Sequence, residues 1–269
     1  FLFWTFFIAF MGWIWSRLST YKTLEAENKT YFWIFFLSVQ AFFLLILSTI
    51  SNPFALVYPA LEDGSGLNPL LQHPGMIFHP PVLFLGYAGF TVPSCLALAV
   101  GLSAKNQDWL PRIRNWVIFS WIMLTAGIIL GAWWSYMELG WGGYWAWDPV
   151  ENASLLPWLF ASAFIHTSLL NRRTKALPRT NIFLCAVTLL MCFFATFITR
   201  SGLIDSLHAF GQGGLGTPFI VLMLLSLLLA GLIAAVARFE NSNSLSEPVS
   251  KQGMVLVLTW LLAAIGLVI

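Results

Sequence analysis

Long apolar runs alternate with short polar segments along the whole chain. Read with a window of about 19 residues, each run has roughly the length that an α-helix needs to cross a bilayer. The predicted spans lie near residues 1–16, 30–50, 77–101, 115–137, 152–171, 181–199, 217–238 and 254–269. The pattern predicts an all-α fold: a polytopic integral membrane helix bundle of eight transmembrane helices, forming a single membrane domain over residues 1–269.

Composition supports this class and bears on the ends of the chain. Hydrophobic residues make up 59% of the sequence and charged residues only 9%. The chain opens at Phe1 inside an apolar run that has no basic leader and no cleavage site, and it stops at Ile269 inside another apolar run. We expect both ends to be cuts within a longer protein.

Charge sorts the segments between the spans into two sets. One set holds all of the 13 cationic residues except Arg200, which lies in the other set. Because short cytoplasmic loops carry the excess of Lys and Arg, we expect the loops at 51–76, 138–151 and 200–216 to face outward. Topology and lipid head groups then explain the basic residues, and nothing in the sequence resembles a nucleic-acid surface.

The histidines point to the outer face as the place of function. His73, His79 and His208 fall in the predicted outward loops, and only His166 lies inside a span. The three cysteines all lie in apolar spans without a C-x-x-C pair, so thiol exchange is not expected. The sequence also lacks a glycine-rich phosphate loop and a nucleophile elbow, so nucleotide-driven and ordinary hydrolase functions find no support.

The outward loop at 138–152 is unusually aromatic. Its segment WGGYWAWDPVEN, residues 141–152, carries three tryptophans and a tyrosine within seven residues, followed by two carboxylates. The order Asp148, Pro149, Val150, Glu151 predicts a helix start with Asp at the N-cap, Pro at N1 and Glu at N3. Asp148 and Glu151 therefore need no chemical role.

The flat surface of this loop has two credible uses. Tryptophan often lies where lipid meets water, so the rings could anchor the loop to the bilayer. They could also receive a large flat hydrophobic ligand by stacking and edge contacts. The imidazoles of the neighbouring loops favour a planar ligand that holds an iron, because such a ligand takes nitrogen donors on both sides of its plane.

A wider match supports the second use. The segment WGGYWAWDPVENASLLPWL, residues 141–159, resembles the tryptophan-rich, or WWD, signature of the haem-handling proteins of cytochrome c maturation. The residues that follow its Asp-Pro pair are similar to the CcmF/NrfE branch. Supporting matches are NPLLQ at 68–72, FHPP at 78–81, RSG at 200–202 and SLHAF at 206–210.

The resemblance implies a haem lyase subunit, which holds haem at the outer membrane face and promotes thioether bonds to the CxxCH site of an apocytochrome c. His79 and His208 would be the axial ligands of the outer haem, with His73 as an alternative first-loop donor. His166 would bind a separate intramembrane haem b, whose second ligand would come from beyond Ile269. The residues implied to contact the outer haem are Trp141, Gly142, Gly143, Tyr144, Trp145, Trp147, Asp148 and Arg200.

Catalysis of this kind would rest on positioning and redox control of haem, so no acid or base is assigned a catalytic role. Asp205 or Glu138 could orient an imidazole by a hydrogen bond. A non-catalytic haem chaperone or haem conduit, or a transporter of another flat molecule, stays open at this stage. Copurified haem would argue against the transporter, and turnover with an apocytochrome would separate a lyase from a conduit.

The resemblance also implies a location and partners. We expect the bacterial cytoplasmic (inner) membrane, with the tryptophan-rich loop on the periplasmic side. The expected partners are a CcmE-like haem carrier, apocytochrome c, CcmH/CcmI-like maturation subunits, membrane lipid and quinol as a source of electrons, with no nucleic acid. Which apocytochrome is served, a general one or a nitrite reductase, stays open.

Overall fold

The computed structural model describes residues 1–56, 58–59, 62–64, 66–103, 108–174, 177–203, 206 and 214–239, with isolated positions between 254 and 265. All regular structure in these residues is helical, which confirms the all-α class. The elements are α1 (Leu2–Arg17), α2 (Ser19–Lys22), α3 (Ala26–Ser48), η1 (Pro69–Leu71), α4 (Gly75–Leu102), α5 (Leu110–Glu138), α6 (Pro149–Thr174), α7 (Pro178–Arg200) and α8 (Gly216–Val236).

The first seven predicted spans coincide with long helices, and the span predicted at 254–269 lies largely outside the described residues. Among the described helices, 6 are long and apolar enough to cross a membrane, namely α3 to α8. Helix α1, with 16 residues, is shorter. The fold is a membrane helix bundle, while the predicted count of eight helices is not established.

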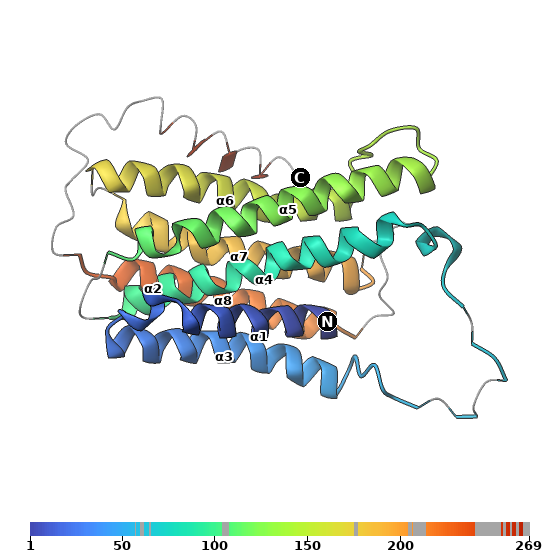
Figure 1. Cartoon of the computed structure of the whole chain (residues 1–269), viewed down its shortest axis with the longest axis horizontal. Helices are drawn as coiled ribbons and strands as arrows, with labels where there is room; N and C mark the ends of the chain where they lie inside the picture. The colour runs from blue at the N-terminus through green and yellow to red at the C-terminus, as the bar shows by residue number, and fades with distance from the viewer. Residues whose placement is uncertain are drawn as a thin grey trace.

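The helices form one bundle along a common direction, with α4 at its centre (Figure 1). Helix α4 packs against α1, α3, α5, α7 and α8. Most of the length of α4 and α7 is buried, whereas only about a fifth of the apolar stretch of α3, α5 or α8 is buried. The exposed side chains of α8 are mainly leucines, as expected for a surface that faces lipid.

Small residues bring α4 and α5 into close contact. A Cβ atom at Gly86 would lie 2.7 Å from the backbone nitrogen of Leu124, and one at Gly127 would lie 2.7 Å from the Cα atom of Leu83. Only glycine therefore permits this separation of the two backbones. Close approach through small residues is typical of helix packing inside membranes, where hydrophobic burial does not drive association.

The long helices alternate in direction, so their ends form two groups. The described cations, Arg200 excepted, gather at the end of the bundle where α4 and α6 finish and α5 and α7 begin. The opposite end brings together the start of α4, the end of α5, the start of α6 and the end of α7 (Figure 1). This is the end predicted to face outward, and it carries the candidate site.

Candidate functional site

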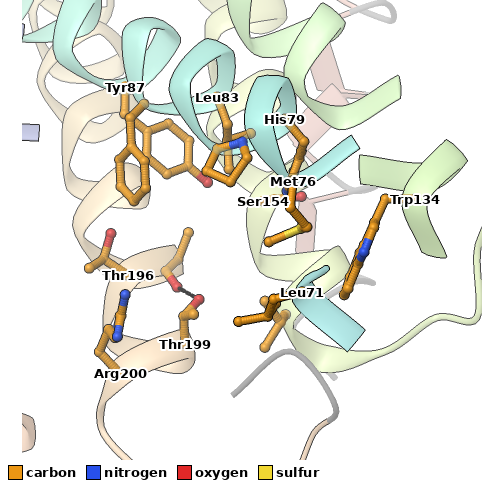
Figure 2. Close-up of a pocket in the computed structure, with 14 residues that line it drawn as sticks. Leu71, Met76, His79, Leu83, Tyr87, Trp134, Ser154, Thr196, Thr199 and Arg200 are labelled. Atoms are coloured by element: carbon orange, nitrogen blue, oxygen red, sulfur yellow. Dashed lines mark hydrogen bonds between the residues drawn. The ribbon is translucent and has the colours of Figure 1, made fainter. Parts of the chain in front are cut away.

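A cavity of about 350 Å³ opens at this end between α4, α5, α6 and α7. Helix α4 contributes one face and α7 the facing wall, as Figure 2 shows. The start of α6, Trp134 of α5 and Leu71 of η1 complete the lining. The polar groups in this mainly apolar space come from His79, Tyr87, Ser154, Thr196, Thr199 and Arg200.

His79 is held by a backbone carbonyl of the neighbouring helix. Its Nδ1 lies 2.7 Å from the carbonyl oxygen of Gly127 in α5. A carbonyl only accepts hydrogen bonds, so the neutral ring carries its proton on Nδ1 and its lone pair on Nε2. His79 was grouped with the outward loops although it falls within the span predicted at 77–101. The span is confirmed and the loop placement is wrong, because α4 begins at Gly75 and includes Pro80 and Pro81. The ring is therefore fixed on a helix that lines the cavity.

His73 has the opposite arrangement. Its Nδ1 accepts a hydrogen bond of 3.0 Å from the backbone N–H of Gly75, so the proton of the neutral ring sits on Nε2. That Nε2 lies 4.0 Å from a carboxylate oxygen of Glu138. The ring also makes an edge contact with Trp133, at 5.1 Å between centroids. Both nitrogens of His73 thus face groups of the protein, although 4.0 Å is too long for a hydrogen bond to Glu138.

His166 lies on α6, far from the cavity along the helix, as the sequence predicted. Its Nδ1 lies 2.7 Å from the carbonyl oxygen of Ser162, one turn earlier in the same helix, which again places the lone pair on Nε2. The ring of Trp260 lies 6.2 Å from it. His79 and His166 therefore share one tautomer, although they use different carbonyls.

The tryptophan-rich loop is ordered by contacts of its own. The indole of Trp141 donates to the carbonyl of Gly143 at 3.0 Å, and Tyr144 stacks on Tyr136 of α5 at 4.4 Å. Trp147 adopts a positive φ of 59° and is 68% exposed. None of these rings lines the cavity. The loop therefore presents aromatic surface beside the cavity mouth, where α6 begins, rather than inside it.

The predicted helix start after this loop is confirmed. The Asp148 carboxylate accepts from the backbone N–H of Val150 at 2.9 Å, and Glu151 reaches back to accept from the N–H of Asp148 at 3.3 Å. Glu151 also accepts from the N–H of Ala146 at 2.8 Å and is only 7% exposed. This cap, which resembles a capping box, ties the end of the aromatic loop to the first turn of α6.

The same cap reaches the loop that carries the predicted second ligand. The hydroxyl of Ser206 donates to Asp148 at 2.9 Å. His208 and Asp205, the other candidates of that loop, lie outside the described residues. The described geometry therefore joins the 206 position to the tryptophan-rich loop but does not test the role predicted for His208.

Arg200, the single cation predicted on the outer side, lines the cavity at the end of α7. Its guanidinium lies 5.9 Å from the centroid of the Phe1 ring. Figure 2 shows it across the cavity from His79, on the same wall as Thr196 and Thr199. A positive group at the cavity rim suits an anionic substituent of a ligand.

Comparison with known proteins places this arrangement in a family. A family model described as "Cytochrome C assembly protein" matches residues 2–204. The chain belongs to the cytochrome c assembly protein family. The probable cytochrome c-type biogenesis protein NrfE of Escherichia coli K12 is 42% identical over 229 residues, which are 84% of this chain and 42% of that protein. The CcmF protein of Haemophilus influenzae is 36% identical over 261 residues, or 95% of this chain and 40% of that protein.

A solved structure titled cytochrome c haem lyase CcmF has the same fold. It matches with a TM-score of 0.76 and 28% sequence identity, over 99% of this chain and 39% of that one. This member of the cytochrome c assembly family therefore spans about two fifths of the length of these relatives. Together with the apolar helices, the match shows a multi-pass membrane protein.

Several residues of the cavity were not foreseen from the sequence of this family member. Trp134 lines the cavity and donates its indole N–H to the carbonyl of Leu70 at 3.1 Å, which holds η1 against α5. Thr196 and Thr199 line the α7 wall. The spacing of Thr196, Thr199 and Arg200, which share a helix face, was the available signal.

Proposed function

We propose that this chain is the haem-holding part of a cytochrome c haem lyase, which presents haem for attachment to the CxxCH site of an apocytochrome c. The observation that carries this proposal is the hydrogen bond between Nδ1 of His79 and the carbonyl of Gly127. A carbonyl bond at Nδ1 places the lone pair on Nε2, the nitrogen that an iron would need, in a cavity beside the tryptophan-rich loop.

The residues present fit haem in three respects. His79 supplies an imidazole donor, Arg200 a positive charge for a propionate, and the rings at 141–147 aromatic surface at the boundary of the site. The cavity of about 350 Å³ is smaller than a whole haem, so only part of a macrocycle would enter it. When bound, haem supplies two vinyl groups, each of which takes up a thiol as a thioether without net oxidation or reduction.

The protein's own contribution would be to position the haem and to exclude water from it. His79 and His208 would hold the iron, and Trp141, Trp145 and Trp147 would limit the movement of the haem. Family membership and the tautomers favour His79 over His73 as the first ligand, because His73 keeps its proton on Nε2 and uses Nδ1 as an acceptor.

We further propose that His166 binds an intramembrane haem b. Its tautomer matches that of His79, and its position on α6 keeps it apart from the outer site. The second ligand would come from another helix of the longer protein. In this proposal the outer haem is the substrate, and a haem held by His166 would supply electron transfer, with quinol as the source of electrons.

Location and partners complete the proposal. Residues 1–269 would form one membrane domain in the bacterial inner membrane, with the 138–152 loop on the periplasmic side. A CcmE-like carrier would deliver haem, and apocytochrome c would receive it with the help of CcmH/CcmI-like subunits. The positive charge at the opposite end of the bundle supports this orientation.

A haem chaperone is the second candidate, because the described lining of the cavity holds neither a carboxylate nor a thiol. Such a lining suits a holding site without chemistry. An assay with a haem-loaded carrier and an apocytochrome decides between them. Thioether-linked product that depends on this protein supports the lyase, and bound haem that is never linked, with every partner present, supports the chaperone.

The haem sites are tested by a pyridine haemochrome assay on the purified full-length protein and its His79→Ala, His208→Ala and His166→Ala variants. We expect the first two to lose the outer haem and keep the inner one, and the third to do the reverse. If His79→Ala binds as much haem as the parent protein, with the same absorption spectrum, the ligand role of His79 is wrong.

A further inference from the structure

The imidazole of His79 lies against two glycines of the neighbouring helix, Gly127 and Gly131, which are four residues apart on one face of α5. We propose that these glycines are positioning residues, a seat that fixes the rotation and the tautomer of the His79 ring. Their role rests on the proposed function, in which His79 binds the haem iron. Neither glycine would touch haem itself.

Gly127 gives the seat its hydrogen bond. In an α-helix the carbonyl of Gly127 accepts the N–H of Gly131, and its second lone pair can accept from outside the helix. That outside donor is Nδ1 of His79, at 2.7 Å. The bond is possible because Gly127 lacks a side chain, since its Cβ would lie 2.7 Å from the Cα atom of Leu83 and force the helices apart.

Gly131 provides the surface against which the His79 ring packs. A Cβ atom at this position would lie 2.6 Å from Cε1, 2.8 Å from Nδ1 and 3.2 Å from Nε2 of His79. The three nearest atoms all belong to that one ring. The close approach at Gly131 therefore serves the imidazole, whereas those at Gly86 and Gly127 serve the packing of two backbones.

The two contacts restrict the ring in different ways. The Gly127 carbonyl selects the Nδ1–H tautomer and so leaves the lone pair on Nε2, while Gly131 sets how far the ring can approach α5. Partners of this kind change metal affinity by about 10- to 100-fold when they are removed from a histidine ligand. Substitution at Gly131 is expected to act on His79 without removing any ligand.

The test uses the full-length protein with Gly131→Ala, compared with Gly101→Ala and His79→Ala. Alanine at Gly101 would meet the side chain of Ile233 at the far end of α4, so this variant controls for a clash inside the bundle. The first measurement is the ¹⁵N NMR spectrum of haem-free protein labelled on histidine, with the His79 signals assigned by their loss in His79→Ala. The second is the affinity and absorption spectrum of the outer haem.

We expect the parent protein and Gly101→Ala to show His79 protonated on Nδ1. Gly131→Ala should shift these signals and lower the affinity for the outer haem by about 10-fold or more. A parent spectrum with His79 protonated on Nε2 overturns the seat even if Gly131→Ala fails to fold. So does a Gly131→Ala variant with unchanged signals and unchanged haem affinity. If His79→Ala itself keeps the outer haem, the proposed function fails, which is a separate result.

Discussion

His79 and His166 are held by the same kind of bond but by different parts of the molecule. His79 donates to a carbonyl of α5, 48 residues away along the chain. His166 donates to a carbonyl of its own helix, 4 residues earlier. The first imidazole therefore depends on how two helices pack, whereas the second depends only on α6 being helical. The outer position should respond to changes on a neighbouring helix, and the inner one should not.

The two surroundings fit the roles proposed for the two haems. A ligand held across a helix interface can be released by a small movement of one helix, as a site that gives up its haem requires. A ligand held within one helix stays in place as long as the helix does. This suits a haem that is retained.

The largest effect is expected from Gly131→Leu. Leucine would occupy the space of the His79 ring, so we expect at least a 10-fold loss of outer-haem affinity with the His166 haem unchanged. Difference spectra of the two haems, separated by the His166→Ala variant, measure this. Gly231→Leu is the matched control, because a Cβ at Gly231 meets nothing within 4 Å. Equal loss of both haems would show that His79 does not depend on the neighbouring helix more than His166 does.

The next effect concerns the cap that joins the aromatic loop to α6. Glu151→Ala removes a buried carboxylate that accepts from the N–H groups of Ala146 and Asp148. The loss of two such bonds should destabilise the loop end locally by about 1–3 kcal/mol. Hydrogen exchange at these two amides should speed up by about 10-fold or more, while amides around His166 keep their rates.

Glu151→Gln serves as the control for this variant, because its remaining carbonyl oxygen can still accept. It should give a smaller change at the same amides. Unchanged exchange in Glu151→Ala would mean that the capping box does not hold the loop end.

The bundle and the cap could be predicted from sequence because both depend on local pattern. Apolar runs set the spans, and the spacing of Asp148 and Glu151 set the cap. His79 was grouped with the outward loops although it falls near the start of the span predicted at 77–101. Inside a membrane bundle, neighbouring helices can compensate for the missing N–H groups of Pro80 and Pro81, so α4 begins before them.

The cavity lining and the seat could not be predicted in this way. Trp134 and Thr196 line the same cavity only because α5 and α7 both end at this end of the bundle, which no local sequence pattern indicates. The group that holds His79 is a backbone carbonyl, and every residue has one. Only the packing of α4 on α5 selects Gly127 for this role.

A smaller effect is expected on the His166 side. Trp158, two turns before His166, donates to the hydroxyl of Thr125 at 2.8 Å and stacks on Trp121 at 5.3 Å. Thr125→Val should cost about 0.6 kcal/mol, the usual size of a hydrogen bond between membrane helices. A double-mutant cycle with Trp158→Phe, measured by reversible unfolding in detergent, gives the coupling. A coupling of zero would show that the bond between Trp158 and Thr125 does not stabilise α6 near His166.

The smallest effect is expected at His73, where the comparison is sharpest. His73 lies six residues before His79 in the same predicted outer region, but it accepts at Nδ1 and faces Glu138 with Nε2. His73→Gln should therefore leave the content and the spectrum of the outer haem unchanged, while His79→Gln should remove that haem. The pyridine haemochrome assay on both full-length variants measures the difference. If His73→Gln loses the outer haem and His79→Gln keeps it, the tautomers do not identify the ligand. Gly127 and Gly131 would then position an imidazole that does not bind haem.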